Sequence, residues 1–388
     1  MSENSGNKIN GIPMVIYWQK MPYELKVKHA ANLVHDFYNN PEIGGNTYIS
    51  VGGLDSIVLT LFIRSLGYTQ EDVPAMSVSS LEHPGNQQVH KAIGVKPIPR
   101  GRDKNGEVWT LPKVYRECGY PIISKQYAHH AHMAKHPSDK NKNSSEEIRR
   151  RNEEDRKGEI EKGHWVRVFS KNLYEKGFKQ DYDFEISDKC CKLMKEAPCK
   201  KWAKSEGRYP YLGLMADEGG PREMSLINNG CNYISEKTKR SCPFASFSRD
   251  DILRLALEMD AWYKEHWEEL NPDFKVDSII PSAYGEVVDY IGDDGKKHYK
   301  TTLAQRTGCT VCGFGTHILA KHRPHNFDLL RMENPKAWDV ATKPVEEGGW
   351  GWGKVLDHFE IPWRDEPKIN EQQNIFREID EEIRSMKR

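Results

Sequence analysis

The stretch 48–62 constrains the fold of this chain more than any other part of the sequence. It begins with a short β-prone run, turns on Gly52 and Gly53, and continues into an apolar segment that is too long for a second strand. A strand, a glycine turn and a helix in this order point backbone N–H groups and the positive end of a helix dipole at an anion. Two glycines let the main chain approach a phosphate closely, and Asp55 or Ser56 can cap the helix. The same pattern is also typical of an ordinary strand-to-helix connection.

Further strands and helices alternate after this turn. The segments 73–79, 95–98 and 211–215 read as strands, whereas 57–66 and 188–201 read as helices. The segment 248–258 reads as an amphipathic helix with Ser248 as its capping residue. This alternation predicts an α/β fold with a Rossmann-like, mainly parallel sheet, followed by a C-terminal region of helices and a hairpin at 287–300. Because ligands of open α/β sheets bind beyond the carboxyl ends of the strands, we expect the loops after Ile49, Val78 and Met215 to share one site.

Composition divides the chain further. We expect an N-terminal extension at 1–40, a nucleotide-binding α/β domain at 41–250 with a charged insertion at about 125–180, a region at 251–363 that contains a Cys-x-x-Cys pair, and a helical tail at 364–388. Within the tail, Ile375, Ile379 and Ile383 form one helical stripe, which predicts packing on its own domain or on a second subunit of a homodimer.

Net charge argues against a general attraction to polyanions. Lys and Arg together number 57, as do Asp and Glu, so the formal net charge is zero. Only a local basic patch would serve a nucleic-acid partner, and the sequence leaves that partner open. No apolar run approaches the roughly 20 residues of a membrane span, and the first residues lack a signal-peptide pattern. We therefore expect a cytoplasmic protein without a membrane role.

The eight cysteines include two groups with metal-ligand spacing. Cys190 and Cys191 are adjacent, and Cys309 and Cys312 form a Cys-x-x-Cys pair. In a reducing compartment such groups bind metals or take part in catalysis. Four thiolates suit a [4Fe–4S] cluster or a structural zinc ion, and the adjacent pair favours the cluster because it can reach different irons. A redox-active dithiol and ordinary buried thiols remain alternatives.

The other candidate ligands are weaker. Cys118, Cys199 and Cys242 read as core or surface thiols, and Cys231 is a reserve ligand should the adjacent pair supply only one sulfur. His129, His132 and His136 would share one face of a helix, but no carboxylate or cysteine lies at matching helical spacing to complete a metal site. Surface histidines are the simpler interpretation.

Several blocks of the sequence resemble a known family. The glycine turn is similar to the pyrophosphate loop (PP-loop) of the adenine nucleotide α-hydrolase superfamily. More closely, the chain resembles a bacterial branch of the phosphoadenylylsulfate (PAPS) reductase family. The blocks lie in consistent order from about residue 45 to 363: Val51-Gly-Gly-Leu-Asp-Ser56, Gly119-Tyr-Pro-Ile-Ile-Ser-Lys125, Ser187-Asp-Lys-Cys-Cys191, Met215-Ala-Asp-Glu218, Asn229-Gly-Cys-Asn232, Gln305-Arg-Thr-Gly-Cys309, Cys312-Gly-Phe-Gly315, Lys343-Pro-Val-Glu-Glu-Gly-Gly349 and Gly353-Lys-Val-Leu-Asp357.

This resemblance implies a fold, two cofactors and a field of chemistry. It implies a Rossmann-like nucleotide α-hydrolase fold that binds an adenine nucleotide, ATP or PAPS, and an iron–sulfur protein of sulfur metabolism. The predicted nucleotide-binding residues are Gly52, Gly53, Asp55, Ser56, Glu82 and Arg222, with His83 also near the ligand. The layout of Cys190, Cys191, Cys309 and Cys312 is similar to the [4Fe–4S] ligand set of adenylylsulfate reductases.

Two departures from the family pattern decide what activity to expect. Val51 and Leu54 stand where the family loop usually has Ser and Lys, and Gly219-Gly-Pro221 precedes Arg222 where a serine and charged residues are usual. Family reductases also use a nucleophilic cysteine near the C-terminus, and no cysteine follows Cys312 here. We expect an adenine-nucleotide-dependent sulfur-transfer enzyme that lacks the reductase nucleophile. The alternative is a non-catalytic scaffold or sensor that binds nucleotide and cluster.

Overall fold

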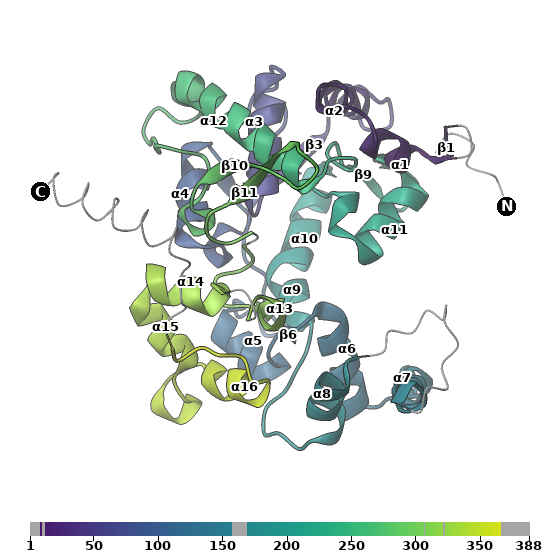
Figure 1. Ribbon diagram of the computed structural model, residues 1–388, viewed down its shortest axis with the longest axis vertical. Coiled ribbons are helices and arrows are strands. Elements are labelled where there is room, and N and C mark those ends of the chain that lie inside the picture. Colours follow the sequence, from purple (N-terminus) through teal and green to yellow (C-terminus); the bar gives the residue numbers. More distant parts are fainter. Residues whose placement is uncertain (1–7, 10–11, 157–168, 306, 321–322, 366–388) are drawn as a thin grey trace, which may run out of the picture. The chain divides into compact units, whose positions relative to one another are not determined.

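The computed structural model of the chain describes residues 8–9, 12–156, 169–305, 307–320 and 323–365. The chain divides into two compact units, and each unit combines two separate ranges of the sequence: Met1–Pro99 with Pro198–Gly308, and Arg100–Ala197 with Cys309–Arg388. Figure 1 labels many of the helices and some of the strands of both units. The predicted tail stripe of Ile375, Ile379 and Ile383, part of the charged insertion (157–168), and Arg306 lie outside the described residues.

Among the described residues, six strands form the sheet of the first unit, in the order β5-β4-β3-β7-β9-β8. Neighbouring strands are parallel except for the β8–β9 pair at one edge. The prediction of an α/β fold with a mainly parallel sheet is therefore confirmed. The strands are β3 (Thr47–Ser50), β4 (Ala75–Ser77), β5 (Lys96–Pro97), β7 (Tyr209–Tyr211), β8 (Asn232–Ile234) and β9 (Lys239–Ser241).

Helix α3 (Leu54–Ser65) is the centre of the core of the first unit. Residues 56–64 are all buried, as expected of a helix that is apolar nearly all round. The predicted helix after Ser248 is α12 (Arg249–Leu270), which packs against α3, and Ser248 and Asp251 form a capping box at its start. The remaining helical elements are α1 (Met14–Gln19), α2 (Tyr23–Tyr38), η2 (Ser79–Leu81), α4 (Pro84–Ala92), α10 (Ala197–Glu206), η5 (Ala216–Glu218), α11 (Gly220–Asn229) and η6 (Ser282–Tyr284).

The fourth strand lies earlier in the chain than the sequence indicates. It is β7, which ends at Tyr211, and residues 212–215 have no regular structure. Here Gly213 comes against the start of α3, where a Cβ atom would lie 3.0 Å from the carbonyl carbon of Asp55. The predicted hairpin is present as β10 (Val287–Ile291) and β11 (Lys297–Thr301), and β1 (Lys8–Ile9) pairs antiparallel with β2 (Ile12–Pro13).

The second unit is mainly helical. Its strands β6 (Ile122–Ile123) and β12 (Gly313–Phe314) pair in parallel. Its helical elements are α5 (Leu111–Cys118), α6 (Lys125–Lys135), α7 (Lys142–Arg156), α8 (Lys171–Tyr174), η3 (Glu175–Lys179), α9 (Lys189–Cys191), η4 (Lys192–Glu196), α13 (Thr316–Leu319), α14 (Asn326–Glu333), α15 (Pro335–Thr342), η7 (Val345–Glu347) and α16 (Trp352–His358). None of the described helices combines the length and apolar character that crossing a bilayer requires.

Candidate metal centre and glycine turn

The segment 120–123 lies between the two cysteine-bearing parts of the chain. On one side Tyr120 pairs with Ile186, four residues before Cys190. On the other side Ile122 pairs with Gly313, the residue after Cys312. One short segment therefore aligns two stretches that are more than a hundred residues apart in the sequence, and both belong to the second unit.

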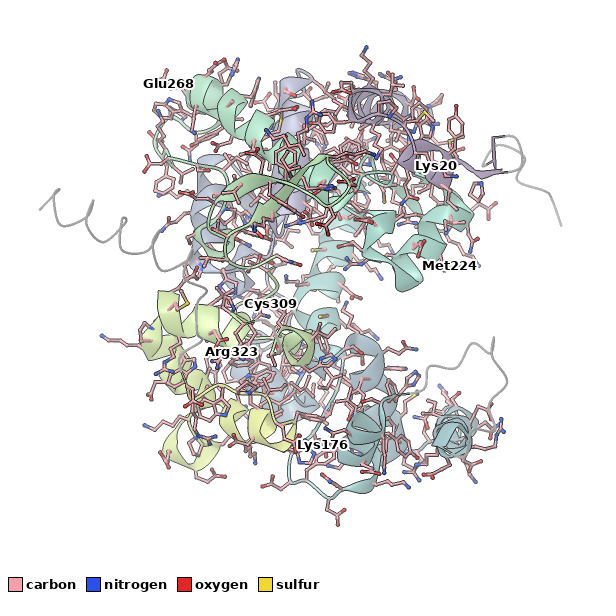
Figure 2. All side chains as sticks on the ribbon, viewed as in Figure 1. Lys20, Lys176, Met224, Glu268, Cys309 and Arg323 are labelled. Carbon is pink, nitrogen blue, oxygen red and sulfur yellow. The ribbon has the colours of Figure 1, made fainter. Side chains whose placement is uncertain are left out.

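Backbone contacts hold the Cys-x-x-Cys loop, in which Figure 2 labels Cys309. The hydroxyl of Tyr115 donates a 2.7 Å hydrogen bond to the carbonyl oxygen of Val311. The side-chain amide of Asn326 donates a 3.1 Å hydrogen bond to the carbonyl oxygen of Cys312. Gly313 has no room for a side chain, since a Cβ atom there would lie 2.6 Å from Ile122 Cδ1. The loop is thus fixed by contacts to its main chain.

The adjacent cysteines lie at the start of an irregular helix. Cys190 and Cys191 belong to the single turn α9, which continues directly into the π-helical turn η4. Helix α5 packs against α9. A π-helical turn is a common feature of functional sites because its wider turn changes the direction of neighbouring side chains. Such a change allows two consecutive sulfurs to serve different partners.

The four thiols lie close enough to influence each other electrostatically. Burial raises the pKa of the Cys190 thiol strongly, and Cys309, Cys312 and Cys191 add to that rise. Burial, Cys309 and Cys191 do the same for the pKa of Cys312. The pKa of Cys191 is also raised by burial, whereas Lys125 and Lys195 oppose the rise. The four cysteines that the sequence predicts as ligands are therefore brought together, with two lysine side chains near them.

The spacing of this donor set fits a cluster better than a single ion. Thiolates on one tetrahedral zinc ion, with Zn–S bonds of about 2.3 Å, lie roughly 3.8 Å apart. All eight cysteines are described, and no three of their sulfurs lie within 4.8 Å of one another. The four irons of a cube accept sulfurs at wider spacing.

The remaining cysteines are placed elsewhere. Cys231 and Cys242 lie in the first unit, one before β8 and one after β9, and the N–H of Cys242 donates to the carbonyl oxygen of Cys231. Burial, then the neighbouring Cys242, raises the pKa of Cys231 to about 12. Cys199 also lies in the first unit, whereas Cys118, in the second, ends α5. The structure describes all eight cysteines, and none of them forms a disulfide.

The glycine turn of the first unit joins β3 to α3 as the sequence indicates. Gly53 is the residue before the helix, and Gly52 has ordinary room for a small side chain. The N–H of Gly52 donates to Ser56 Oγ at 2.7 Å, and Ser56 Oγ donates back to the carbonyl oxygen of Gly53. The N–H of Leu54 donates to the hydroxyl of Tyr284 at 3.2 Å. Two backbone donors of the predicted anion site are thus bound by hydroxyl groups of the chain itself.

The segments that follow β3, β4 and β7 meet around this turn. After β4, Glu82 is buried, and its carboxylate lies 3.7 Å from the position of a Cβ atom on Gly52. His83, which precedes α4, is also buried. After β7, the close approach of Gly213 to Asp55 brings the third loop to the same helix end.

Two predicted binding residues are engaged in ion pairs. Asp55 pairs with Arg249 at 2.7 Å, and each side chain is about three-quarters buried. The N–H of Arg249 also donates to Asp217, from the loop after β7. Arg222 is exposed and pairs with the buried carboxylate of Glu218. Arg222 would have to leave this partner to hold an anion.

Sequence reasoning did not identify several residues that contact the turn. Tyr284 accepts a hydrogen bond from Thr307 Oγ1 at 2.9 Å, and Asn86 donates to the same Thr307 oxygen. His90 Nε2 lies 2.8 Å from the carbonyl oxygen of Gly52. Arg249 could have been found from its place directly after the helix cap Ser248. Tyr284 ends the single helical turn η6, which is too short to show a periodic pattern in the sequence, so no signal marked it.

Comparison with known proteins gave no match of any of the three kinds sought, whether to a family model, a curated protein or a solved structure.

Proposed function

We propose that this chain is a PAPS reductase-like iron–sulfur protein of sulfur metabolism. Its first unit would be a Rossmann-like nucleotide-binding domain of the adenine nucleotide α-hydrolase type. Its second unit would hold a [4Fe–4S] cluster on Cys190, Cys191, Cys309 and Cys312. The observation that carries the proposal is the approach of these four thiols around the segment 120–123.

The chain supplies what a cluster needs from its surroundings. Two of the thiols are buried, and Lys195 favours the charged form of three of them, which offsets part of the negative charge of a thiolate-bound cluster. The hydrogen bonds to Val311 and Cys312 fix the loop backbone before any cofactor binds. When bound, such a cluster can act as a structural anchor or carry sulfur at an open iron. Reduced thiols and this cofactor favour the cytoplasm as its compartment.

Iron and sulfide quantitation tests the cluster. Protein purified without oxygen should contain iron and acid-labile sulfide in equal amounts and show sulfur-to-iron absorption bands. Cys309→Ser should remove most of both. Cys118→Ser is the matched control, because Cys118 lies in the same unit but outside the quartet, and it should retain both. Iron content that is unchanged by Cys309→Ser would overturn the ligand assignment, as would zinc in place of iron.

The nucleotide proposal concerns the start of α3. The supporting observations are the glycine turn and the convergence of three loops on it. The phosphate groups would lie against Gly52, Gly53 and Ser56, with Glu82 facing the nucleoside and Arg222 contacting the phosphates. Because hydroxyls bind the Gly52 and Leu54 N–H groups, a phosphate would either displace them or accept hydrogen bonds from them.

Because the N–H groups of Gly52 and Leu54 already donate to hydroxyls of the chain, a second candidate is a non-catalytic scaffold or sensor module. Both candidates keep the cluster, and they differ in nucleotide turnover. Release of pyrophosphate from ATP, or of adenosine 3′,5′-bisphosphate from PAPS, is measured together with equilibrium binding of each nucleotide and separates the two candidates. Release above the background of a Gly53→Ala variant supports the enzyme, whereas binding without release supports the module. If the protein neither binds nor turns over ATP or PAPS, the nucleotide assignment is rejected.

A further inference from the structure

A separate group of ligand atoms lies in the second unit, on α6 and beside it. His132 and His136 are four residues apart, and their ring centroids are 4.8 Å apart. Glu185 approaches from a distant part of the sequence, with its Oε2 atom 2.7 Å from His136 Nε2. One ligand atom from each of the three residues lies within 4.8 Å of the other two. The carboxylate that the helix itself does not provide therefore comes from another segment.

The backbone fixes Glu185 independently of the histidines. Its carbonyl oxygen accepts a 2.8 Å hydrogen bond from the N–H of Tyr120. Gly119 lies directly against it, because a Cβ atom at Gly119 would be 2.7 Å from the carbonyl carbon of Glu185. The third ligand is thus held by the same strand-like segment that aligns the cysteines, and it does not depend on a chance contact between surface side chains.

His132 has one unsatisfied ring nitrogen. Its Nδ1 atom is buried and has no hydrogen-bond partner among the described residues. An imidazole nitrogen without a hydrogen bond has an unused lone pair or an unused N–H group. Metal coordination is one way to fix the tautomer of such a ring.

We propose that His132, His136 and Glu185 bind one divalent transition-metal ion of the zinc type, separate from the thiols. Two imidazoles at i and i+4 with one carboxylate form a three-ligand set that leaves a fourth position open for water or a substrate. Lys135 competes with this ion, because its Nζ atom lies 3.0 Å from the Oε1 atom of Glu185. The site would therefore be weaker in the native chain than the same ligands without the lysine.

Zinc and cobalt titrations of the full chain test the site. Competition with a chromophoric chelator should show one equivalent of Zn²⁺ that is lost in His132→Ala, His136→Ala and Glu185→Gln. His129→Ala is the matched control, because His129 lies on the same helix but its ring is near Asp188, and it should keep this equivalent. Co²⁺ at the site should give weak visible bands without the strong sulfur-to-metal absorption of thiolate ligands.

Removing the competitor should act in the opposite direction. Lys135→Met frees the Oε1 atom of Glu185, and zinc affinity should rise on the order of tenfold, the scale on which groups around a ligand affect metal binding. Misfolding cannot produce a gain of zinc affinity, so this variant tests the site even if the ligand variants fold poorly. Equal zinc uptake by the wild type and His136→Ala would overturn the proposal. Zinc uptake that is lost only in Cys309→Ser would also overturn it. Iron is measured in the same samples, so the result for the cluster is obtained separately.

Discussion

The hydroxyl of Tyr115 donates a 2.7 Å hydrogen bond to the carbonyl oxygen of Val311, between the two cysteines of the Cys-x-x-Cys pair. Tyr115 is fully buried, and Cys190, Cys312 and Cys309 all lie close enough to add to the burial that raises its pKa. One side chain thus touches the loop and lies near both groups of cysteines. Its hydrogen bond links helix α5 to the candidate metal centre.

Tyr115→Phe should lower the free energy of unfolding without changing the fold. The change leaves the carbonyl oxygen of Val311 without its partner in a buried place, which costs about 1–3 kcal/mol. Urea unfolding should show the loss as a lower midpoint with an unchanged slope. Tyr290→Phe is the control, because Tyr290 is exposed, and it should change stability by less than about 0.5 kcal/mol. Equal midpoints for the two variants would contradict the assigned role of the bond.

Gly313→Ala should disturb the pairing of β12 with β6. The added Cβ atom would meet Ile122, the carbonyl oxygen of Pro121 at 2.8 Å and the ring of Trp352 at 2.9 Å. Overpacking of this kind costs about 1–3 kcal/mol, and the shifted loop should make Cys312 react faster with a thiol reagent. Gly52→Ala is the control, because its Cβ atom would have only ordinary contacts. Unchanged thiol reactivity in Gly313→Ala would show that the loop does not depend on this close packing.

The sequence was enough to predict those elements whose own residues show a periodic pattern or a capping residue. The apolar run after Gly53 predicted α3, and Ser248 predicted the start of α12, because helix periodicity and capping are written in neighbouring residues. The parallel sheet followed from the alternation of strands and helices. The strand predicted at 211–215 was displaced because the close approach of Gly213 to Asp55 is a tertiary contact that no local pattern reveals.

The candidate sites were less predictable, for a physical reason. The approach of Cys190 to Cys312 depends on two strand-like pairings with the segment 120–123, which is too short to show periodicity. Spacing marked the cysteines as ligands, but it could not place them together. Similarly, helical spacing did not reveal a carboxylate near His132 and His136. Glu185 belongs to another segment, which backbone contacts hold beside the helix.

Tyr284→Phe should change how the glycine turn binds anions. The hydroxyl of Tyr284 accepts the N–H of Leu54, and its removal frees that donor at the start of α3. If the turn is a phosphate site, ATP should raise the melting temperature of the variant more than that of the wild type, because tighter binding stabilises the folded state. Thr307→Val is the control, because it removes a neighbouring hydroxyl and leaves the Leu54 contact in place. An identical response to ATP in all three proteins would argue against this turn as the phosphate site.

His29 should make the chain less stable in acid. Its ring stacks on Trp18 with centroids 3.9 Å apart, and burial lowers its pKa from 6.5 to about 4, a shift that Asp36 partly opposes. Because the folded state holds the proton more weakly, the unfolded state binds more protons between these two values. The stabilisation is therefore complete above about pH 6.5 and is lost as the pH falls toward 4.

His29→Phe should flatten this acid limb and keep the ring stack. We expect the wild type to lose about 1–2 kcal/mol more than the variant between neutral pH and pH 4, less than the full shift would give because the ring is partly exposed. Urea unfolding at a series of pH values measures the difference directly. His266→Phe is the matched control, because His266 also stacks on a tryptophan, Trp262, and its variant should follow the wild-type curve. Parallel curves for His29→Phe and the wild type would show that His29 is not the group that titrates.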